Sequence, residues 1–346
     1  MPSRLRARAG RTDQADPGPP PELFAWSPSG GTAARRPGRW GRLAAGVAAL
    51  AATLSVAVAA PGAGAATSLK VGTLSDAATA YAVSPKTVPG ANDWLCRPSA
   101  AHPRPVVLVH GTAENMGFNW AALSPTLKNA GYCVFALNYG DNLASLDERI
   151  GGLGDIAASA GELKAFIDKV RFFTGAAKVD IVGHSQGGMM PSYYLKRLGG
   201  ASKVGTFVGL VPSNHGTTLS GITELGTQLG LISGFNTVAM LTAPSLVQQE
   251  IGSDFQKALF ADGDTVAGPR YVVITTKKDS VVTPYTQALL KGPNVTNIVI
   301  QDQCPDDTVG HIGIVFDGPA LQNVVNQLGP NTSGFKPSCT GYGIGV

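Results

Sequence analysis

The sequence predicts an α/β fold with a mostly parallel central sheet and helices on both of its faces. Six short runs rich in β-branched apolar residues recur along the chain, and segments with helical spacing separate most of them. Strands that alternate with helices in this way form parallel sheets. The runs are apolar almost throughout rather than at every second residue, which indicates strands that are covered on both faces.

The expected elements follow in chain order. Strands are expected at residues 106–109, 133–138, 179–183, 204–211, 271–275 and 297–300. Helices are expected at residues 120–129, 156–174, 189–198 and 285–290, with one more after residue 311. The pattern at 156–174 is the clearest, because its apolar residues recur every three or four positions and therefore share one face.

Residues 214–270 interrupt this alternation with a long interval rich in Gly, Thr and Ser. An insertion at this place would lie over the carboxyl ends of strands, where ligands enter α/β sheets. Two interpretations stay open: a cap or lid with an apolar inner face, or ordinary packing helices. The apolar residues at helical spacing are Ile222, Leu225, Leu229, Leu231, Ile232 and Phe235.

Residues 1–65 are expected to be an export signal that is cleaved, which leaves residues 66–346 as one catalytic domain. Arginines precede an uncharged run of Ala, Val and Leu at 43–60, and Ala63 and Ala65 offer small residues for cleavage after Ala65. This order is typical of a secretory signal peptide. A retained membrane anchor is the alternative, although the run is rich in alanine and only weakly apolar.

The net charge of the expected mature chain argues against nucleic acid as a partner. The full chain carries a net charge of +4, but residues 1–65 hold 8 of the 27 basic and 3 of the 23 acidic residues. The remainder has 19 basic (27 − 8) and 20 acidic (23 − 3) residues, a net charge of −1. It has no cluster of basic residues interleaved with aromatic ones, so nucleic-acid binding is not expected.

All four cysteines lie beyond residue 65, and an even number in an exported protein indicates disulfides. Three pairings of four cysteines exist. The favoured pairing is Cys96–Cys133 with Cys304–Cys339, because each bond would tie an irregular segment to a nearby element. A metal site is disfavoured because the chain has no Cys-x-x-Cys spacing and no histidine beside a cysteine.

The most informative motif is Gly-His-Ser-Gln-Gly at residues 183–187. It follows an apolar run and precedes a segment with helical spacing, as in the nucleophile elbow, a strand–turn–helix that presents one serine above a sheet. Ser185 is the candidate nucleophile. Gly183 and Gly187 stand two residues before and after it, where a Cβ would crowd the turn. The alternative is a glycine-rich turn that contains a serine by chance.

A serine hydroxyl needs a base, and the base needs an orienting carboxylate. After an elbow the expected chain order is serine, acid, histidine. Of the five histidines, His311 is the candidate base because it alone follows the suitable acids. Asp279 is the candidate acid because it follows the strand expected at 271–275, and Asp302, after the next strand, is its rival.

The negative charge that develops on the substrate oxygen needs two backbone donors. One is expected to be the N–H of Gln186, the residue after the nucleophile. The other is expected to be the N–H of Thr112, because His110 and Gly111 form a turn after the first strand.

Together these motifs resemble secreted bacterial triacylglycerol lipases of class 2, over residues 105–328 approximately. The resemblance rests on Val-His-Gly-Thr at 109–112, Gly-His-Ser-Gln-Gly-Gly at 183–188, Asp279 and His-Ile-Gly at 311–313. It implies an α/β-hydrolase fold with Ser185, Asp279 and His311 as the triad. The smallest members of that family lack a cap, so the long 214–270 interval departs from them.

The sequence therefore predicts a secreted serine carboxylester hydrolase, with acylglycerols as the leading substrates and an acyl-serine intermediate. No metal or organic cofactor is expected. The mature chain is expected to have no membrane span and to be a monomer. A short-chain esterase and a polyester hydrolase share the same machinery. An acyltransferase, in which an alcohol replaces water, and a binding protein without activity are the remaining alternatives.

Overall fold

The computed structural model describes residues 68–142, 145, 148–233 and 243–346. The predicted export signal at 1–65 lies outside these residues, as does Phe235, and the side chains of Leu231 and Ile232 are likewise not described. In the described residues no helix is long and apolar enough to cross a membrane.

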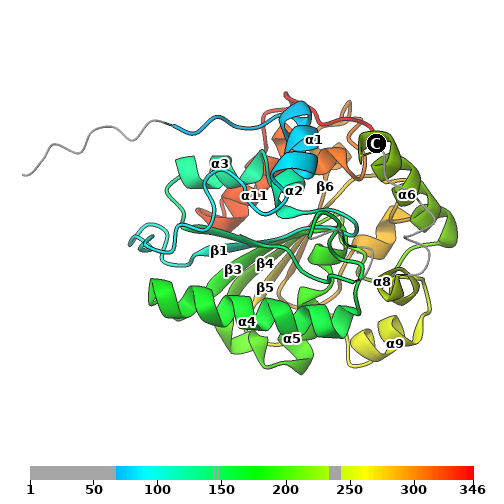
Figure 1. The fold of residues 1–346 in the computed structure, drawn as a ribbon, viewed down its shortest axis with the longest axis horizontal. Helices are drawn as coiled ribbons and strands as arrows, with labels where there is room; N and C mark the ends of the chain where they lie inside the picture. Colours follow the sequence, from blue (N-terminus) through cyan, green and yellow to red (C-terminus); the bar gives the residue numbers. More distant parts are fainter. Residues whose placement is uncertain (1–67, 143–144, 146–147, 234–242) are drawn as a thin grey trace, which may run out of the picture. The chain divides into compact units, whose positions relative to one another are not determined.

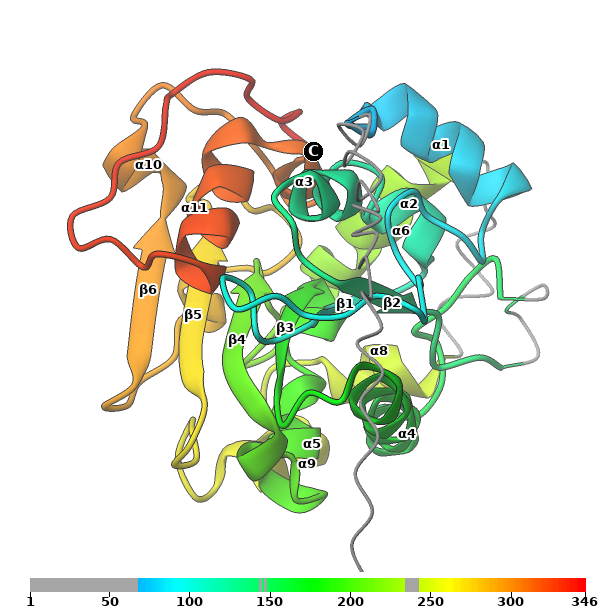
Figure 2. The ribbon, with the colours of Figure 1, turned by 90° about the vertical axis from the view of Figure 1, so that its left-hand side faces the viewer.

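The centre of the fold is a six-stranded parallel sheet with the strand order β2-β1-β3-β4-β5-β6 (Figure 2). This confirms the predicted fold class. Each predicted run corresponds to one strand within two residues at either end. The strands are β1 (Val106–Val109), β2 (Val134–Leu137), β3 (Val179–His184), β4 (Val204–Leu210), β5 (Arg270–Thr275) and β6 (Val295–Val299).

Helices cover both faces of the sheet, as Figure 1 shows. On one face lie α4 (Ile156–Thr174) and α5 (Pro191–Arg197), and on the other α3 (Leu123–Asn129) and α11 (Gly318–Leu328). Each face has its own apolar core. Val107, Phe135 and Ile181 point into the first, whereas Val106, Leu108 and Val182 point into the second. Successive strand residues face opposite sides, which is why the runs are apolar throughout.

The predicted helix at 156–174 coincides with α4, while two other predictions differ from the structure. Residues 285–290 form only a 3₁₀ turn at Tyr285–Ala288, which ends where Leu289 adopts an extended conformation. The strand predicted at 297–300 ends one residue earlier, where Ile300 begins α10 (Ile300–Gln303). The sequence analysis also missed α1 (Leu74–Val83) and α2 (Met116–Asn119).

The interval 214–270 contains α6 (Leu219–Ser233), α8 (Pro244–Gln248) and α9 (Asp254–Phe260). Ile222, Leu225 and Leu229 of α6 are buried in a third apolar cluster, which also contains Ala113 and Ile312. Because these last two residues adjoin candidate site residues, α6 packs at the end of the sheet where the site lies.

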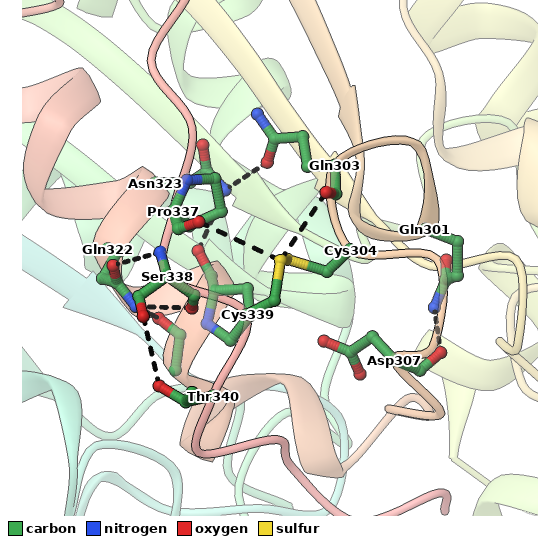
Figure 3. The surroundings of a disulfide bond; sticks show 12 residues. Gln301, Gln303, Cys304, Asp307, Gln322, Asn323, Pro337, Ser338, Cys339 and Thr340 are labelled. Carbon is green, nitrogen blue, oxygen red and sulfur yellow. Dashed lines mark hydrogen bonds between the residues drawn. A yellow bond between two sulfur atoms is a disulfide. The ribbon is translucent and has the colours of Figure 1, made fainter.

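Both favoured disulfide pairings occur in the structure, Cys96–Cys133 and Cys304–Cys339. Figure 3 shows the second bond beside α11, where Ser338 exchanges hydrogen bonds with Gln322. The bond thereby ties the C-terminal segment to the end of α10.

Candidate active site

The candidate residues come together because parallel strands end at a common edge. Ser185 directly follows β3, Thr112 lies three residues after β1, and Asp279 lies four residues after β5. His311 comes from the loop between α10 and α11. The adjacent strands β1, β3, β4 and β5 thus present the loops that carry the site at one side of the sheet.

The turn at Ser185 has the strained geometry that the elbow requires. Ser185 has φ 54°, a region that residues other than glycine rarely adopt. The two glycines make room for it. A Cβ on Gly183 would lie 2.8 Å from the backbone nitrogen of Gly188 and closer still to Gly187. A Cβ on Gly187 would run into the backbone at Val109. A 3₁₀ turn (Ser185–Gly188) then leads into α5.

His311 and Asp279 form a buried pair. The Nδ1 atom of His311 lies 3.0 Å from both carboxylate oxygens of Asp279. Asp279 also accepts the N–H groups of Val281 and Val282, which fix the position of its carboxylate. A carboxylate only accepts hydrogen bonds, so Nδ1 carries the hydrogen and the Nε2 of neutral His311 keeps its lone pair. In the described part of the chain this Nε2 is buried without a hydrogen-bond partner.

The loop that carries His311 is held by the C-terminal segment. The N–H of Gly310 donates to the carbonyl of Ile344, and the N–H of Ile312 donates to that of Val346. These bonds lie on either side of His311, so its backbone has little freedom. These two hydrogen bonds explain how a histidine in a loop keeps a fixed position.

The rival candidates lie elsewhere. Asp302 is exposed and pairs with Lys277. His102 packs against Tyr132, and His215 lies 3.4 Å from Asp264. The remaining two, His110 and His184, are buried beside the site but do not contact Asp279.

The two candidate oxyanion residues are bonded to each other. The side chain of Gln186 donates from Nε2 to Thr112 Oγ1 at 2.9 Å and to the carbonyl of Gly152 at 2.9 Å. Among the described residues, neither backbone N–H of this pair donates to another protein group. Two such donors, fixed relative to each other and unused, suit an oxygen that becomes negatively charged.

Further residues that the sequence analysis missed support this arrangement. Gln249, which follows α8, donates from Nε2 to Thr112 Oγ1 at 3.0 Å and accepts the hydroxyl of Ser213 at 2.9 Å. The sequence holds no signal for this contact, because Gln249 and Thr112 are 137 residues apart.

Within the described ranges, no group of three or more His, Cys, Asp or Glu side chains is placed to hold a metal ion. A groove of about 410 Å³ beside α11 is lined by none of the candidate residues, and we assign it no part in the reaction. Its lining residues are Thr126, Leu321, Gln322, Val325, Asn326, Pro330, Thr332 and Phe335.

A parallel sheet with a serine in a strained strand–helix turn and a buried histidine–aspartate pair defines an α/β-hydrolase. The chain belongs to the class 2 lipase family, whose model matches residues 103–322. It is similar to the triacylglycerol lipases of Pseudarthrobacter phenanthrenivorans and Burkholderia plantarii. Each is 33% identical over 99 residues, which is 27% of this chain and 28% and 25% of theirs. The chain thus matches only about a quarter of the length of these curated relatives.

The fold is also similar to a solved lipase. The crystal structure of Aspergillus fumigatus lipase B superposes with a TM-score of 0.54 at 22% identity, covering 71% of this chain and 61% of that one. At this level of identity the likeness concerns the fold alone.

Proposed function

We propose that this chain is a serine carboxylic ester hydrolase that cleaves acylglycerols. The observation that carries the proposal is the His311–Asp279 pair: the Nε2 of His311 has no partner among the described residues, and Asp279 follows β5 at the edge of the sheet where Ser185 follows β3. Membership of the class 2 lipase family supports an ester as the substrate. An acyl chain suits a site bordered by the apolar cluster that contains Ala113 and Ile312.

The proposed reaction proceeds in two steps. Nε2 of His311 takes the proton of the Ser185 hydroxyl as its oxygen attacks the ester carbonyl carbon. The N–H groups of Thr112 and Gln186 bind the oxygen that becomes negative, and protonated His311 then gives its proton to the leaving alcohol. Water attacks the acyl-serine with His311 again as base, and Ser185 is released. Asp279 keeps Nδ1 protonated throughout. No cofactor takes part.

The first experiment is Ser185→Ala, assayed on emulsified acylglycerols and on a soluble ester. We expect hydrolysis to fall by roughly 10⁴-fold or more, because the nucleophile and base act as a unit. Ser75→Ala, on the exposed face of α1, is the matched control and should keep the full rate. Hydrolysis that survives in folded Ser185→Ala protein would refute the assignment.

The substrate class is tested with esters of two to eighteen acyl carbons. A hydrolysis rate that stays constant or rises as the acyl chain lengthens supports the assignment as a lipase. A steep fall beyond short chains, or release of soluble products from a solid polyester, would replace it with a short-chain esterase or a polyester hydrolase. Transfer of the acyl group to an added alcohol in preference to water would indicate an acyltransferase.

We further propose that the protein is exported and acts as a monomer. Two disulfides suit an oxidising compartment outside the cytosol, and the arginine-flanked apolar run at 43–60 suits an export signal. N-terminal sequencing of protein collected from the medium should then begin at Ala66. An intact N-terminus on membrane-bound protein would show instead that the run is a retained anchor.

A further inference from the structure

A second buried acid–histidine pair lies beside the candidate triad and takes no part in the steps described above. Glu114 is 1% exposed and His184 is fully buried. Oε2 of Glu114 lies 3.0 Å from Nδ1 of His184. Two ionisable groups buried together cost desolvation energy that their mutual attraction does not always return. Their presence at the site therefore calls for an explanation other than stability.

The contacts of His184 define its charge. Nδ1 faces the Glu114 carboxylate, and Nε2 lies 3.1 Å from the carbonyl oxygen of His311. Carboxylates and carbonyls accept hydrogen bonds and do not donate them, so both of these acceptors are satisfied when each ring nitrogen carries hydrogen. His184 is then an imidazolium and Glu114 a carboxylate.

The electrostatic surroundings agree with this charge state. Burial alone would lower the pKa of His184, but Glu114, the His311 carbonyl and Asp279 together raise it above its usual value. Burial alone would raise the pKa of Glu114, but His184, the Gly111 N–H and His110 together lower it. The rings of His184 and His311 lie 5.1 Å apart.

The pair connects three backbone segments of the candidate site. Oε2 of Glu114 accepts the N–H of Gly111 at 3.0 Å, next to the oxyanion donor Thr112. His184 donates a hydrogen bond from Nε2 to the carbonyl oxygen of His311, the candidate base. His184 also directly precedes Ser185, the candidate nucleophile. Asn119 Oδ1 also accepts the Gly111 N–H at 2.9 Å, while its Nδ2 lies 3.2 Å from His184 Nδ1 and forms no hydrogen bond to a protonated ring nitrogen.

We propose that Glu114 and His184 are positioning residues of the hydrolase reaction. As a charged pair, they fix the position of the His311 backbone relative to the backbone at Gly111 and Thr112. The proposal rests on the proposed function. It concerns the turnover step, because neither side chain lies where a substrate would contact it. The expected result of loosening the pair is therefore a lower kcat at nearly constant KM.

Two neutral double variants test the hydrogen bond to His311 without leaving a lone buried charge. In Glu114→Gln/His184→Gln, the longer amide brings an N–H close to the place of the imidazole Nε2. In Glu114→Gln/His184→Asn, the shorter amide reaches only the place of Nδ1. Asp180→Asn is the control, because Asp180 is an equally buried carboxylate at the other end of β3, paired with Arg104 at 2.7 Å.

On a soluble ester we expect the Asn double variant to lose about 10–100-fold in kcat with KM within threefold, because misplacing a catalytic group by about 1 Å has effects of this size. The Gln double variant should stay within fivefold of the unmodified protein, and Asp180→Asn should keep its kcat. Equal kcat values for the two double variants, or a change confined to KM, would overturn the proposal.

A spectroscopic measurement keeps the proposal testable if the variants unfold. In protein with ¹⁵N-labelled histidine, both ring nitrogens of His184 should be protonated at pH 7, and the signal is assigned in the unmodified protein by through-bond correlation to the His184 backbone. A neutral His184 at pH 7 would overturn the charged pair. Activity in Ser185→Ala would defeat the proposed function itself. An inactive Ser185→Ala with two equal double variants would defeat only the positioning role.

Discussion

The close packing around the elbow predicts how much activity and stability a Cβ at Gly187 would cost. In Gly187→Ala, the new Cβ would lie 2.7 Å from the carbonyl carbon of Val109 and nearer still to the Val109 and His110 oxygens. Carbon atoms in contact prefer about 3.5–4.0 Å, so the two backbones would have to separate by about 1 Å. This movement parts the turn of Ser185 from the segment that leads to Thr112.

The expected loss follows from that displacement. We expect kcat on a soluble ester to fall about 100-fold, since 1 Å of misplacement has effects of this size. Overpacking should also cost about 1–3 kcal/mol or more in the free energy of unfolding. Initial rates are normalised by titrating the reactive serine with an aryl phosphonate, and stability is taken from denaturant unfolding.

Gly161→Ala is the matched control. Gly161 lies within α4, and a Cβ there would have nothing within 4 Å. Alanine should therefore stabilise the helix by roughly 0.5–1 kcal/mol and leave the rate unchanged. A Gly187→Ala protein with an unchanged melting temperature and a kcat within threefold of the original would refute the reasoning.

Three further predictions concern the surroundings of the site. Gln249→Leu should lower kcat several-fold and cost about 1–3 kcal/mol of stability, since it leaves the buried Ser213 hydroxyl without its acceptor and removes one of the two donors to Thr112 Oγ1; denaturant unfolding beside initial rates checks both, and unchanged values would contradict it. Reducing the two disulfides, which join residues 37 and 35 positions apart, should cost about 4 kcal/mol each by loop entropy, measured as unfolding with and without reductant. Burial and the neighbouring Asp307 raise the pKa of Asp317 from 3.8 to about 7, so the folded state binds its proton more tightly and stability should fall as pH rises from about 4 to 7, then level off. Asp307→Asn should flatten this fall in melting temperature between about pH 4 and 7, and an equally steep fall would contradict the assignment.

The predictable part of the fold is the part that local periodicity encodes. The strands and α4 follow from apolar patterns because burial of their side chains is set by residues a few positions apart. Asp279 and His311 could be selected by chain order, since an elbow restricts where the acid and the base come from. Helix α1 could not be predicted from the sequence, because its Ala and Thr residues form only a weak apolar stripe. Its buried residues are Ala77 and Tyr81.

The buried polar contacts were beyond sequence reasoning for a different reason. Glu114 and His184 are 70 residues apart and meet only because β1 and β3 are neighbours in the sheet. The motif at 183–187 assigns no role to His184, and Glu114 belongs to none of the motifs. A charged side chain in an unpatterned loop is usually solvated, so only the folded chain reveals that this one is enclosed.

The same contacts bear on the interval 214–270, for which a lid and ordinary packing were both open. Gln249 bonds to Thr112, while Leu225 and Leu229 are buried in the cluster that contains Ile312. Moving α6 and Gln249 away would break the bond to an oxyanion residue and expose both leucines, at a cost of about 1.5–3 kcal/mol for each leucine. We therefore propose that α6 and the end of α8 form a fixed wall of the site. Any opening that admits substrate would have to leave these contacts in place, because the reaction needs Thr112 held where Gln249 and Gln186 hold it.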